Sequence, residues 1–452
     1  MPVSLFSLIP QPQFPCDTLF CSPFNGCRAM KTNFLFVFSF LVLPVFGQQT
    51  DSLAVARKVD SLIQVSDNFT IQGAFDEALK VNTVAEKIAL ERFGPESAVY
   101  GGCCFNRGMV LEYQGDNLQS IKWYLEAKAI FGKTLGEEHP HYALCLNNLG
   151  NIYLTISDYE KAESLYLDSK AILEKALGKE HPYYGNSLLS LSNLYLALGN
   201  YEKAKLLLVE AEAVLEKSLG KEHPDYARIL NNLANMYLSM GDYEKAEPLY
   251  FESKSIREKT LGKEHSDYAE SLTNLAHLYS DLGNYQKAEP FYLDSKTIWE
   301  KSLGKDHPHY AYSLSNLAML YTDMGNYEKA LPLHFETLTI QEKNLGKDHP
   351  NYAGSLINLA ILYSNLGNYE KAETLHLEAK EIFESRIKNL EHPFYMNCLM
   401  NLARLYRKTS NYQKAERFNL KVKATWEKNL GKDHPNYAGS LDNLGYLYLG
   451  MG

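Results

Sequence analysis

The stretch LGKEHPDYARILNNLANMYLSMGDYEKAEPLY, residues 219–250, decides the fold, because its parts return along the chain every 42 residues. Its opening octet returns as LGKEHSDY at 261, as LGKDHPHY at 303 and as LGKDHPNY at 345 and 430. Self-similarity with a period of about 20–50 residues is typical of a solenoid, in which each unit packs only on its neighbours. The sequence therefore predicts an extended stack that presents a surface, rather than a domain that encloses a catalytic pocket.

The first half of each unit carries the signals of a helix. Pro224 suits the first helical turn, where its missing N–H costs nothing, and His223 or the residue before it suits the cap. Apolar residues follow at spacings of three and four as far as Tyr237, which makes one helical face. Gly241 can adopt the left-handed conformation that ends a helix. We expect a helix between these two signals.

A second helix follows in the same unit. Asp242, which is Asn in most other units, is placed to cap it, and an apolar stripe runs from Tyr243 to Leu261. A small residue recurs within the stripe, where it lets two helices approach closely: Ala162, Ala204, Ala246, Ala288, Ala330, Ala372 and Ala415. The fold class that we expect is all-α, a superhelical solenoid of antiparallel helix pairs.

The unit resembles the tetratricopeptide repeat. The residues that carry the resemblance are Leu233, Ala234, Tyr237, Gly241, Ala246, Tyr250 and Ser253. The added LGKEHPDY loop, which lengthens the unit to 42 residues, is similar to the kinesin-light-chain type of repeat. The resemblance covers about 50–452 and implies a right-handed superhelix whose first helices line a concave groove.

Departures from the repeat divide the chain into segments. Residues 51–94 look like a degenerate capping repeat, 95–437 form the tandem units, and 438–452 are the first helix of a truncated last repeat. We expect the array to have continued, or a further domain to have followed, and the apolar face left open on this last helix could drive self-association. The loop 384–393 holds one extra residue and lacks the usual glycine, which predicts a kink in the superhelix there.

The N-terminal segment has the composition of a secretory signal peptide. Residues 30–47 carry Lys31, then an apolar run from Phe34 to Phe46, then Gly47 at the expected cleavage point. An uncleaved anchor is the alternative, although the run is short for a membrane span. We take Met30 as the start and 1–29 as an upstream extension, so we expect export to the periplasm or the medium.

Bulk composition excludes several classes of function. The formal net charge is −9 with acidic and basic residues interspersed, which argues against a nucleic-acid surface. No stretch in the mature chain is long and apolar enough to span a membrane. The seven cysteines are too few and too unevenly placed for a disulfide framework. We expect no cofactor.

Histidine and cysteine recur at fixed positions of the repeat without forming a reactive cluster. The loop histidines are His139, His181, His223, His265, His307, His349, His392 and His434. Equivalent atoms of neighbouring repeats lie about 10 Å apart, whereas zinc needs each nitrogen about 2.0–2.1 Å away, so we expect helix capping or contact with a neighbouring repeat. Cys103, Cys145 and Cys398 stand where other repeats have serine, which indicates packing.

An asparagine ladder is the one positional set that could bind a partner. It consists of Asn106, Asn148, Asn232, Asn274, Asn316, Asn358, Asn401 and Asn443, each beside the buried leucine of its first helix. An amide offers a donor and an acceptor to an extended peptide backbone, and the resemblance implies this contact for the matching position. The alternative is a hydrogen bond between repeats that fixes the superhelical twist, and the two roles are compatible.

Residues next to the ladder are expected to set specificity. They are neutral amides in the early repeats (Asn147, Asn151, Asn193, Asn231 and Asn235), acidic residues in the middle (Glu270, Asp281 and Asp323) and basic residues late in the array (Arg404, Arg407 and Lys408). A ligand with opposite charges at its two ends would match this order.

The sequence therefore predicts a non-catalytic scaffold that binds an extended peptide or a protein surface in a superhelical groove, with an unidentified protein or peptide as partner. The alternative is the sensing arm of a larger enzyme, such as a caspase-like protease or a signalling protein, whose effector is missing from this chain.

Overall fold

The computed structural model describes residues 49–387 and 390–451, and in these residues it contains helices and no strand. The helices follow one another in antiparallel pairs: α2 (Gln49–Ile71), α3 (Phe75–Phe93), α4 (Ala98–Gln114), α5 (Asn117–Thr134), α6 (Pro140–Thr155), α7 (Tyr159–Leu177), α8 (Pro182–Ala197), α9 (Tyr201–Leu219), α10 (Pro224–Ser239), α11 (Tyr243–Leu261), α12 (Ser266–Asp281), α13 (Tyr285–Leu303), α14 (Pro308–Asp323), α15 (Tyr327–Leu345), α16 (Pro350–Asn365), α17 (Tyr369–Glu381), the π-helix η5 (Ile382–Ile387), α18 (Pro393–Lys408), α19 (Tyr412–Leu430) and α20 (Pro435–Met451). The expected all-α solenoid is confirmed.

The loop histidine begins the first helix of each repeat. In α10, Nδ1 of His223 accepts a hydrogen bond of 3.1 Å from the Asp225 backbone N–H, and Pro224 occupies the first turn. The same Nδ1 contact recurs at all eight loop histidines, at 3.0–3.2 Å. A backbone donor at the helix start that would otherwise lack an acceptor is thereby satisfied. The capping role expected for these histidines is confirmed.

A left-handed residue and a polar cap connect the two helices of a repeat. Gly241 has φ +73°, and the side chain of Asp242 then accepts the Lys245 N–H at 3.3 Å to start α11. Two of these turns hold serine instead of glycine, at Ser157 (φ +64°) and Ser410 (φ +60°). An L side chain is strained in this region, which is why glycine fills the position elsewhere.

Small residues bring the helices of a pair into close contact, as the sequence predicts. Ala246 and Ala288 are completely buried. At the position of Ala234, two earlier repeats carry glycine, and a Cβ added at Gly150 would lie 2.7 Å from the Tyr166 ring. Within a pair, the Ser253 hydroxyl donates to the Ala227 carbonyl at 2.7 Å. The core is therefore a continuous seam of such contacts and not one central cluster.

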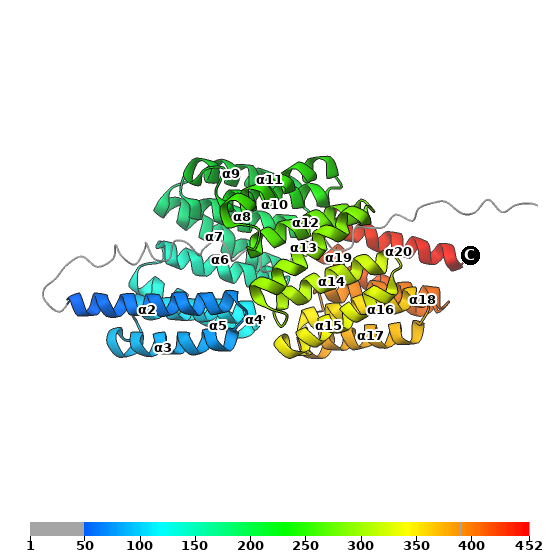
Figure 1. The fold of residues 1–452 in the computed structure, drawn as a ribbon, viewed down its shortest axis with the longest axis horizontal. Helices are drawn as coiled ribbons and strands as arrows, with labels where there is room; N and C mark the ends of the chain where they lie inside the picture. The colour runs from blue at the N-terminus through cyan, green and yellow to red at the C-terminus, as the bar shows by residue number, and fades with distance from the viewer. Residues whose placement is uncertain (1–48, 388–389, 452) are drawn as a thin grey trace, which may run out of the picture.

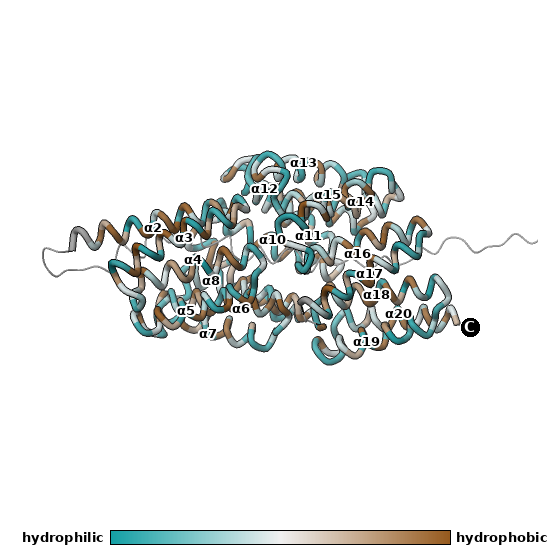
Figure 2. Tube along the Cα trace, turned by 90° about the horizontal axis from the view of Figure 1, so that it is seen from below, coloured by the Kyte–Doolittle hydropathy of each residue, from teal (hydrophilic) through white to brown (hydrophobic). Residues whose placement is uncertain are grey.

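The pairs wind into a superhelix with an inner and an outer layer of helices (Figure 1). The first helices of the repeats (α8 and α10, for example) lie inside, and the second helices (α9 and α11) lie outside. Burial follows this order, since thirteen residues of α8 are buried and only four of α9. Hydrophobic residues alternate with polar ones along the helices (Figure 2), because an outer helix buries only one face.

The extra residue of the 384–393 segment is taken up as the π-helix η5, which directly extends α17. The first unit forms in full, with a 23-residue α2. The last helix, α20, packs against α19 and leaves Leu449 81% exposed and Tyr448 48% exposed. The segments 1–29 and 30–47 lie outside the described residues, so the expected signal peptide stays a prediction.

Candidate functional site

The inner face of the solenoid, formed by the first helices of the repeats, carries the candidate site. The ladder residues Asn106, Asn148, Asn232, Asn274 and Asn401 are buried, while Asn316, Asn358 and Asn443 are half-buried. Most of the ladder amides therefore lie beneath the surface of this face.

Five ladder positions make hydrogen bonds to a neighbouring repeat. Asn232 Nδ2 donates to Asn193 Oδ1 at 2.8 Å, and Asn274 Nδ2 donates to Asn231 Oδ1 at 2.7 Å. The other three contacts are Asn106 Nδ2 to Asp67 Oδ1, Asn148 Nδ2 to Tyr124 Oη at 3.1 Å, and Asn358 Nδ2 to Ser315 Oγ at 3.3 Å. This pattern is the inter-repeat bonding that the sequence left as an alternative.

The remaining ladder residues differ from this pattern. Asn401 Nδ2 donates within its own helix to Asn397 at 2.8 Å, and Asn443 accepts from Arg404 Nε at 3.3 Å. Asn316 Nδ2 is enclosed, and no acceptor among the described residues takes a hydrogen bond from it. Arg404, expected to be a specificity residue, is thus partly engaged in joining α18 to α20.

A second row of amides has its oxygen atoms held by the protein. Tyr166 Oη donates to Asn151 Oδ1 at 2.8 Å, and Tyr250 Oη donates to Asn235 Oδ1 at 2.6 Å. Asn193 Oδ1 accepts from Asn232, as described above. All three side chains are half-buried. No acceptor in the described part of the chain takes a hydrogen bond from Nδ2 of Asn193 or Asn235, so these two repeats present amide donors.

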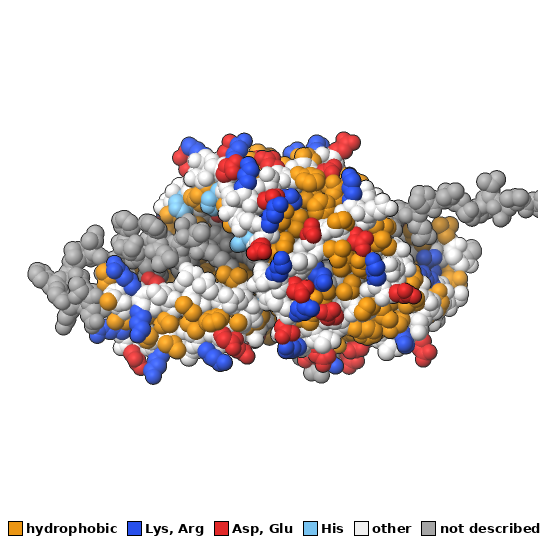
Figure 3. All heavy atoms as spheres, viewed as in Figure 1, with side chains coloured by type: hydrophobic (Ala, Val, Ile, Leu, Met, Phe, Trp, Pro, Cys, Tyr) orange, Lys and Arg blue, Asp and Glu red, His pale blue; other side chains and the backbone are white. Residues whose placement is uncertain are grey.

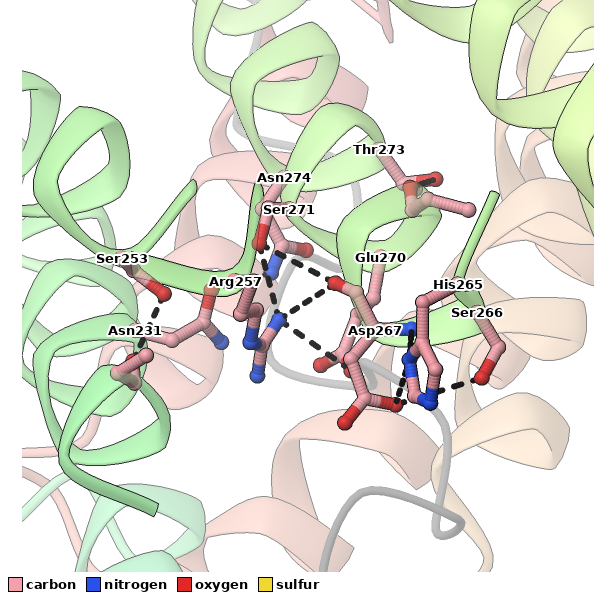
Figure 4. Close-up of polar contacts among 12 residues, drawn as sticks. Asn231, Ser253, Arg257, His265, Ser266, Asp267, Glu270, Ser271, Thr273 and Asn274 are labelled. Carbon is pink, nitrogen blue, oxygen red and sulfur yellow. Dashed lines mark hydrogen bonds and ion pairs between the residues drawn. The ribbon is translucent and has the colours of Figure 1, made fainter. Parts of the chain in front are cut away.

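A buried group of charged side chains joins α10, α11 and α12 (Figure 4). Arg257, 2% exposed, donates to the Asp267 carbonyl at 2.9 Å and to Ser271 Oγ at 3.0 Å, and its guanidinium lies 3.6 Å from Glu270. Arg228, 8% exposed, donates to Asn186 Oδ1 of the previous repeat. Burial lowers the pKa of Arg228, an effect that Asp225 opposes. Glu270, expected to be an acidic specificity residue of the groove, is paired with Arg257.

The sequence reasoning missed this arginine group. Arg228 and Arg257 each interrupt a repeat position that other units fill differently, Arg228 standing where Asn186 and Glu270 stand. A charge at such a position, with the opposite charge one repeat later, is the signal that could have found it.

The carboxyl and basic side chains at the ends of the inner helices form two groups of opposite sign. Burial, followed by the charge of Asp323, raises the pKa of Asp281 to about 7. The pKa of Lys408 is lowered, first by loss of hydration and then by the charges of Arg407 and Arg404. Each group therefore concentrates like charge, the acidic one on α12 and α14 and the basic one on α18.

The described residues contain neither an exposed reactive thiol nor a cluster of metal ligands. Cys103, Cys104, Cys145 and Cys398 are buried free thiols, and burial raises their pKa values. A buried thiol of raised pKa is a poor nucleophile. Residues 49–387 and 390–451 contain no group of three His, Cys, Asp or Glu side chains that could hold a metal ion.

The outer surface is mixed in charge. Figure 3 shows lysine and arginine interspersed with aspartate and glutamate over the visible face, with hydrophobic patches between them. Among the described helices, none is long and apolar enough to cross a membrane.

Comparison with known proteins finds similarity to proteins built of helical repeats. The family model described as tetratricopeptide repeat matches residues 99–175, 157–217, 207–259, 225–295, 267–343, 311–385 and 389–452. A search of curated proteins found no match.

Among solved structures, the chain is similar to BtubC (BKLC) from P. vanneervenii, with 23% identity over 51% of this chain and 91% of that chain, at a TM-score of 0.42. It is similar to the nearly identical TPR-like repeats of a kinesin light chain from Podosopora anserina, with 30% identity over 46% and 98%, at 0.37. A Rap protein complexed with Competence and Sporulation Factor matches 83% of this chain and 99% of its own at 14% identity and a TM-score of 0.57, which supports the fold. Since the family model covers most of the described solenoid, this chain belongs to the tetratricopeptide repeat family.

Proposed function

We propose that this protein is a non-catalytic scaffold that binds an extended peptide segment along the inner face of its solenoid. Tetratricopeptide repeats imply a protein–protein interaction scaffold, and the inner-face binding mode is the finer step. The observation that supports it is the pair of amides at Asn193 and Asn235. Because their oxygens are already held by Asn232 and Tyr250, their N–H groups are oriented to donate to a carbonyl oxygen. Donors fixed in advance lose little entropy on binding.

The two charged groups favour a ligand of defined charge order. A basic segment of the ligand suits Asp281 and Asp323, on α12 and α14. An acidic segment suits Arg404, Arg407 and Lys408, which lie two to three repeats further along, on α18. Complementary charge steers encounter and fixes the register of a bound chain. The neutral amide repeats, which come before both charged groups, then contact backbone and not side chains, so the end of the ligand that lies on them can vary in sequence.

The binding test uses a fluorescein-labelled peptide with a lysine-rich half and a glutamate-rich half, titrated with the full chain and followed by fluorescence anisotropy. Two such peptides carry the halves in opposite order, and a Gly/Ser peptide is the uncharged control. The double variant Asn193→Ala, Asn235→Ala removes two donors, each worth about 1 kcal/mol, so we expect Kd to rise about thirtyfold. Asn117→Ala, on the outer helix α5, is the matched control and leaves Kd unchanged.

The charge order has a separate pair of variants. Arg404→Ala with Arg407→Ala weakens binding of either charged peptide, whereas Arg417→Ala with Lys423→Ala on α19 changes net charge equally and does not. Equal binding by all variants, or binding of the Gly/Ser peptide alone, would contradict the inner-face proposal.

We also propose that the protein is exported, on the composition of residues 30–47 alone. Cell fractionation with an immunoblot tests this. A shortened chain in the envelope or medium is expected, and a mature-size band found only in the cytosol would overturn it.

A further inference from the structure

Successive turns of the superhelix touch through loop histidines and turn glycines. A Cβ added at Gly73 would lie 2.4 Å from His307, one added at Gly115 would lie 2.2 Å from His349, and one added at Gly199 would lie 2.7 Å from His434. The two residues of each pair are separated by 234, 234 and 235 residues. The same contact therefore recurs at a nearly constant separation along the chain. We call the three pairs Gly73–His307, Gly115–His349 and Gly199–His434 the histidine–glycine seam.

A fourth pair of loops continues the seam, where Ser157 replaces glycine and the repeat histidine is His392. The pKa of Tyr159 is raised, first by burial and in smaller part by the charge of Glu391, which places these two loops near each other. The first repeats of the superhelix, α2 to α5, meet the next turn at the loops that precede α14 and α16, where His307 and His349 contact Gly73 and Gly115.

The repeats outside the seam supply an internal comparison. At Gly241, Gly283 and Gly325 an added Cβ would meet nothing within 4 Å, although these residues have the same positive φ. Among histidines of the same motif, His265 is exposed and His223 is half-buried, whereas His307 and His434 are buried and His349 is half-buried. Contact with the other turn therefore buries two of the three seam rings more deeply than the rings outside the seam.

The seam accepts only a neutral histidine. Nδ1 of His434 accepts the Asn436 N–H at 3.0 Å, which leaves its proton on Nε2, 3.3 Å from the Ala197 carbonyl at the end of α8. Nδ1 of His349 is likewise occupied by the Asn351 N–H at 3.1 Å. A second proton would have to enter at Nδ1, where it would replace the helix cap and place a positive charge at a helix N-terminus.

The interface across the turns is narrow. Extensive helix–helix contacts join only elements that are neighbours or next neighbours along the chain. The turns meet instead through loops. Protonation of a few loop histidines would therefore alter much of the contact between the two turns.

We propose that the histidine–glycine seam is a pH-operated clasp, which holds two superhelical turns together at neutral pH and releases them when its histidines are protonated. Release would lengthen the solenoid and widen the inner face without melting any helix. This inference does not rest on the peptide-binding proposal.

The charges near the seam come from both turns. On the histidine side, the carboxylates that precede the rings in the sequence are Asp306, Asp348, Glu391 and Asp433. Asp306 is paired with Lys343 at 2.8 Å, and Glu391 with Lys428 at 3.1 Å. On the glycine side, Asp116 and Asp158 cap α5 and α7, and Asp158 is also paired with Lys161 at 2.7 Å. Asn200 fills the same cap in the third pair.

Burial, and not these charges, sets the direction in which the pKa values of the seam histidines are shifted. Burial, aided at His392 by the charge of His349, lowers the pKa values of His349 and His392 to about 4. Burial also lowers the pKa of His434, against the opposing effect of the Ala197 carbonyl. An exposed histidine titrates near 6.5, so the open form binds more protons between these values and gains population as pH falls through that window.

The test is small-angle X-ray scattering of the full chain from about pH 7.5 down to about pH 4.5, with helicity followed by circular dichroism. We expect the maximum dimension to increase between pH 6.5 and 4.5 while helicity stays constant. The variant H307N/H349N/H392N/H434N keeps a good N-cap residue at each of the four contacts but cannot titrate there, and it loses the pH-dependent change in dimension. The matched control H139N/H181N/H223N/H265N, altered at the same motif outside the seam, keeps the change.

Three results would overturn the clasp. The dimension could stay constant over the whole range in the natural chain. It could increase only together with loss of helicity. Or the seam variant could respond to pH as the natural chain does, which would assign the response to the buried core histidines His141, His277, His334 and His376.

Discussion

The hydroxyl of Tyr250 on α11 donates a 2.6 Å hydrogen bond to Oδ1 of Asn235 on α10, so the outer helix of this repeat orients an amide of the inner face. Tyr166 and Asn151 repeat the arrangement two units earlier at 2.8 Å. The tyrosine ring belongs to the core, since Tyr250 is 1% exposed. Packing and presentation of the amide are therefore coupled through one side chain.

Tyr250→Phe tests this coupling. Loss of the hydroxyl removes one hydrogen bond and keeps the ring, so we expect a loss of about 0.5–1.5 kcal/mol in the free energy of unfolding, measured by urea titration. The freed Asn235 amide can then rotate, which weakens binding of the labelled peptides. Tyr327→Phe is the comparison at a partly buried outer tyrosine. A Tyr250→Phe protein with unchanged peptide affinity would show that the amide needs no orienting.

Replacing glycine by alanine separates backbone strain from contact across the seam. Gly115 (φ +87°) and Gly325 (φ +73°) both hold left-handed conformations, and each Gly→Ala change costs roughly 1–2 kcal/mol for that reason. Only Gly115→Ala also drives a methyl group into His349, which adds overpacking. Thermal unfolding should show the larger loss for Gly115→Ala. Equal losses would mean that the two turns separate freely.

Because Ala288 lies at the contact between two helices, we expect the stability of the protein to depend on the size of the side chain there. The residue is completely buried, and Ala288→Leu should reduce the free energy of unfolding by about 1–3 kcal/mol through overpacking. Ala54→Leu on the exposed part of α2 is the matched control and should change it by less than about 0.5 kcal/mol. Urea titration compares the two, and a tolerated leucine at 288 would contradict close packing there.

Truncation of the buried Arg257 should lower the free energy of unfolding strongly. Arg257→Ala leaves Glu270 without its partner and removes donors to the Asp267 carbonyl, so we expect a loss of about 3–5 kcal/mol. Lys259→Ala, two residues on, removes an exposed pair with Glu222 at 3.6 Å and should cost at most about 1 kcal/mol. Similar losses in urea titration would indicate that Arg257 is hydrated in solution.

The local structure of this protein could be predicted from sequence because its determinants lie within one repeat. His223 caps α10, Asp242 caps α11 and Ala246 is fully buried, each as expected from residue type and spacing. Such features depend on neighbours within about one helical turn or on the adjacent helix.

The candidate site was only partly predictable. Asn232 could serve a ligand or a neighbouring repeat, and nothing in its own unit decides between them, since the hydrogen bond to Asn193 depends on the twist between repeats. The contact between Gly115 and His349 is still harder to predict from the sequence. It depends on a small rotation per repeat, summed over more than five repeats.

The π-helix at Ile382–Ile387 shows how the array accommodates a change in length. One added residue in a regular α-helix turns everything beyond it by about 100°. Here the added residue widens a single turn, and the later contact between Gly199 and His434 still forms at an interval longer by one residue than its two predecessors. The orientation of one helix pair on the next is thus kept across the insertion, because the helix absorbs the added residue before the following cap.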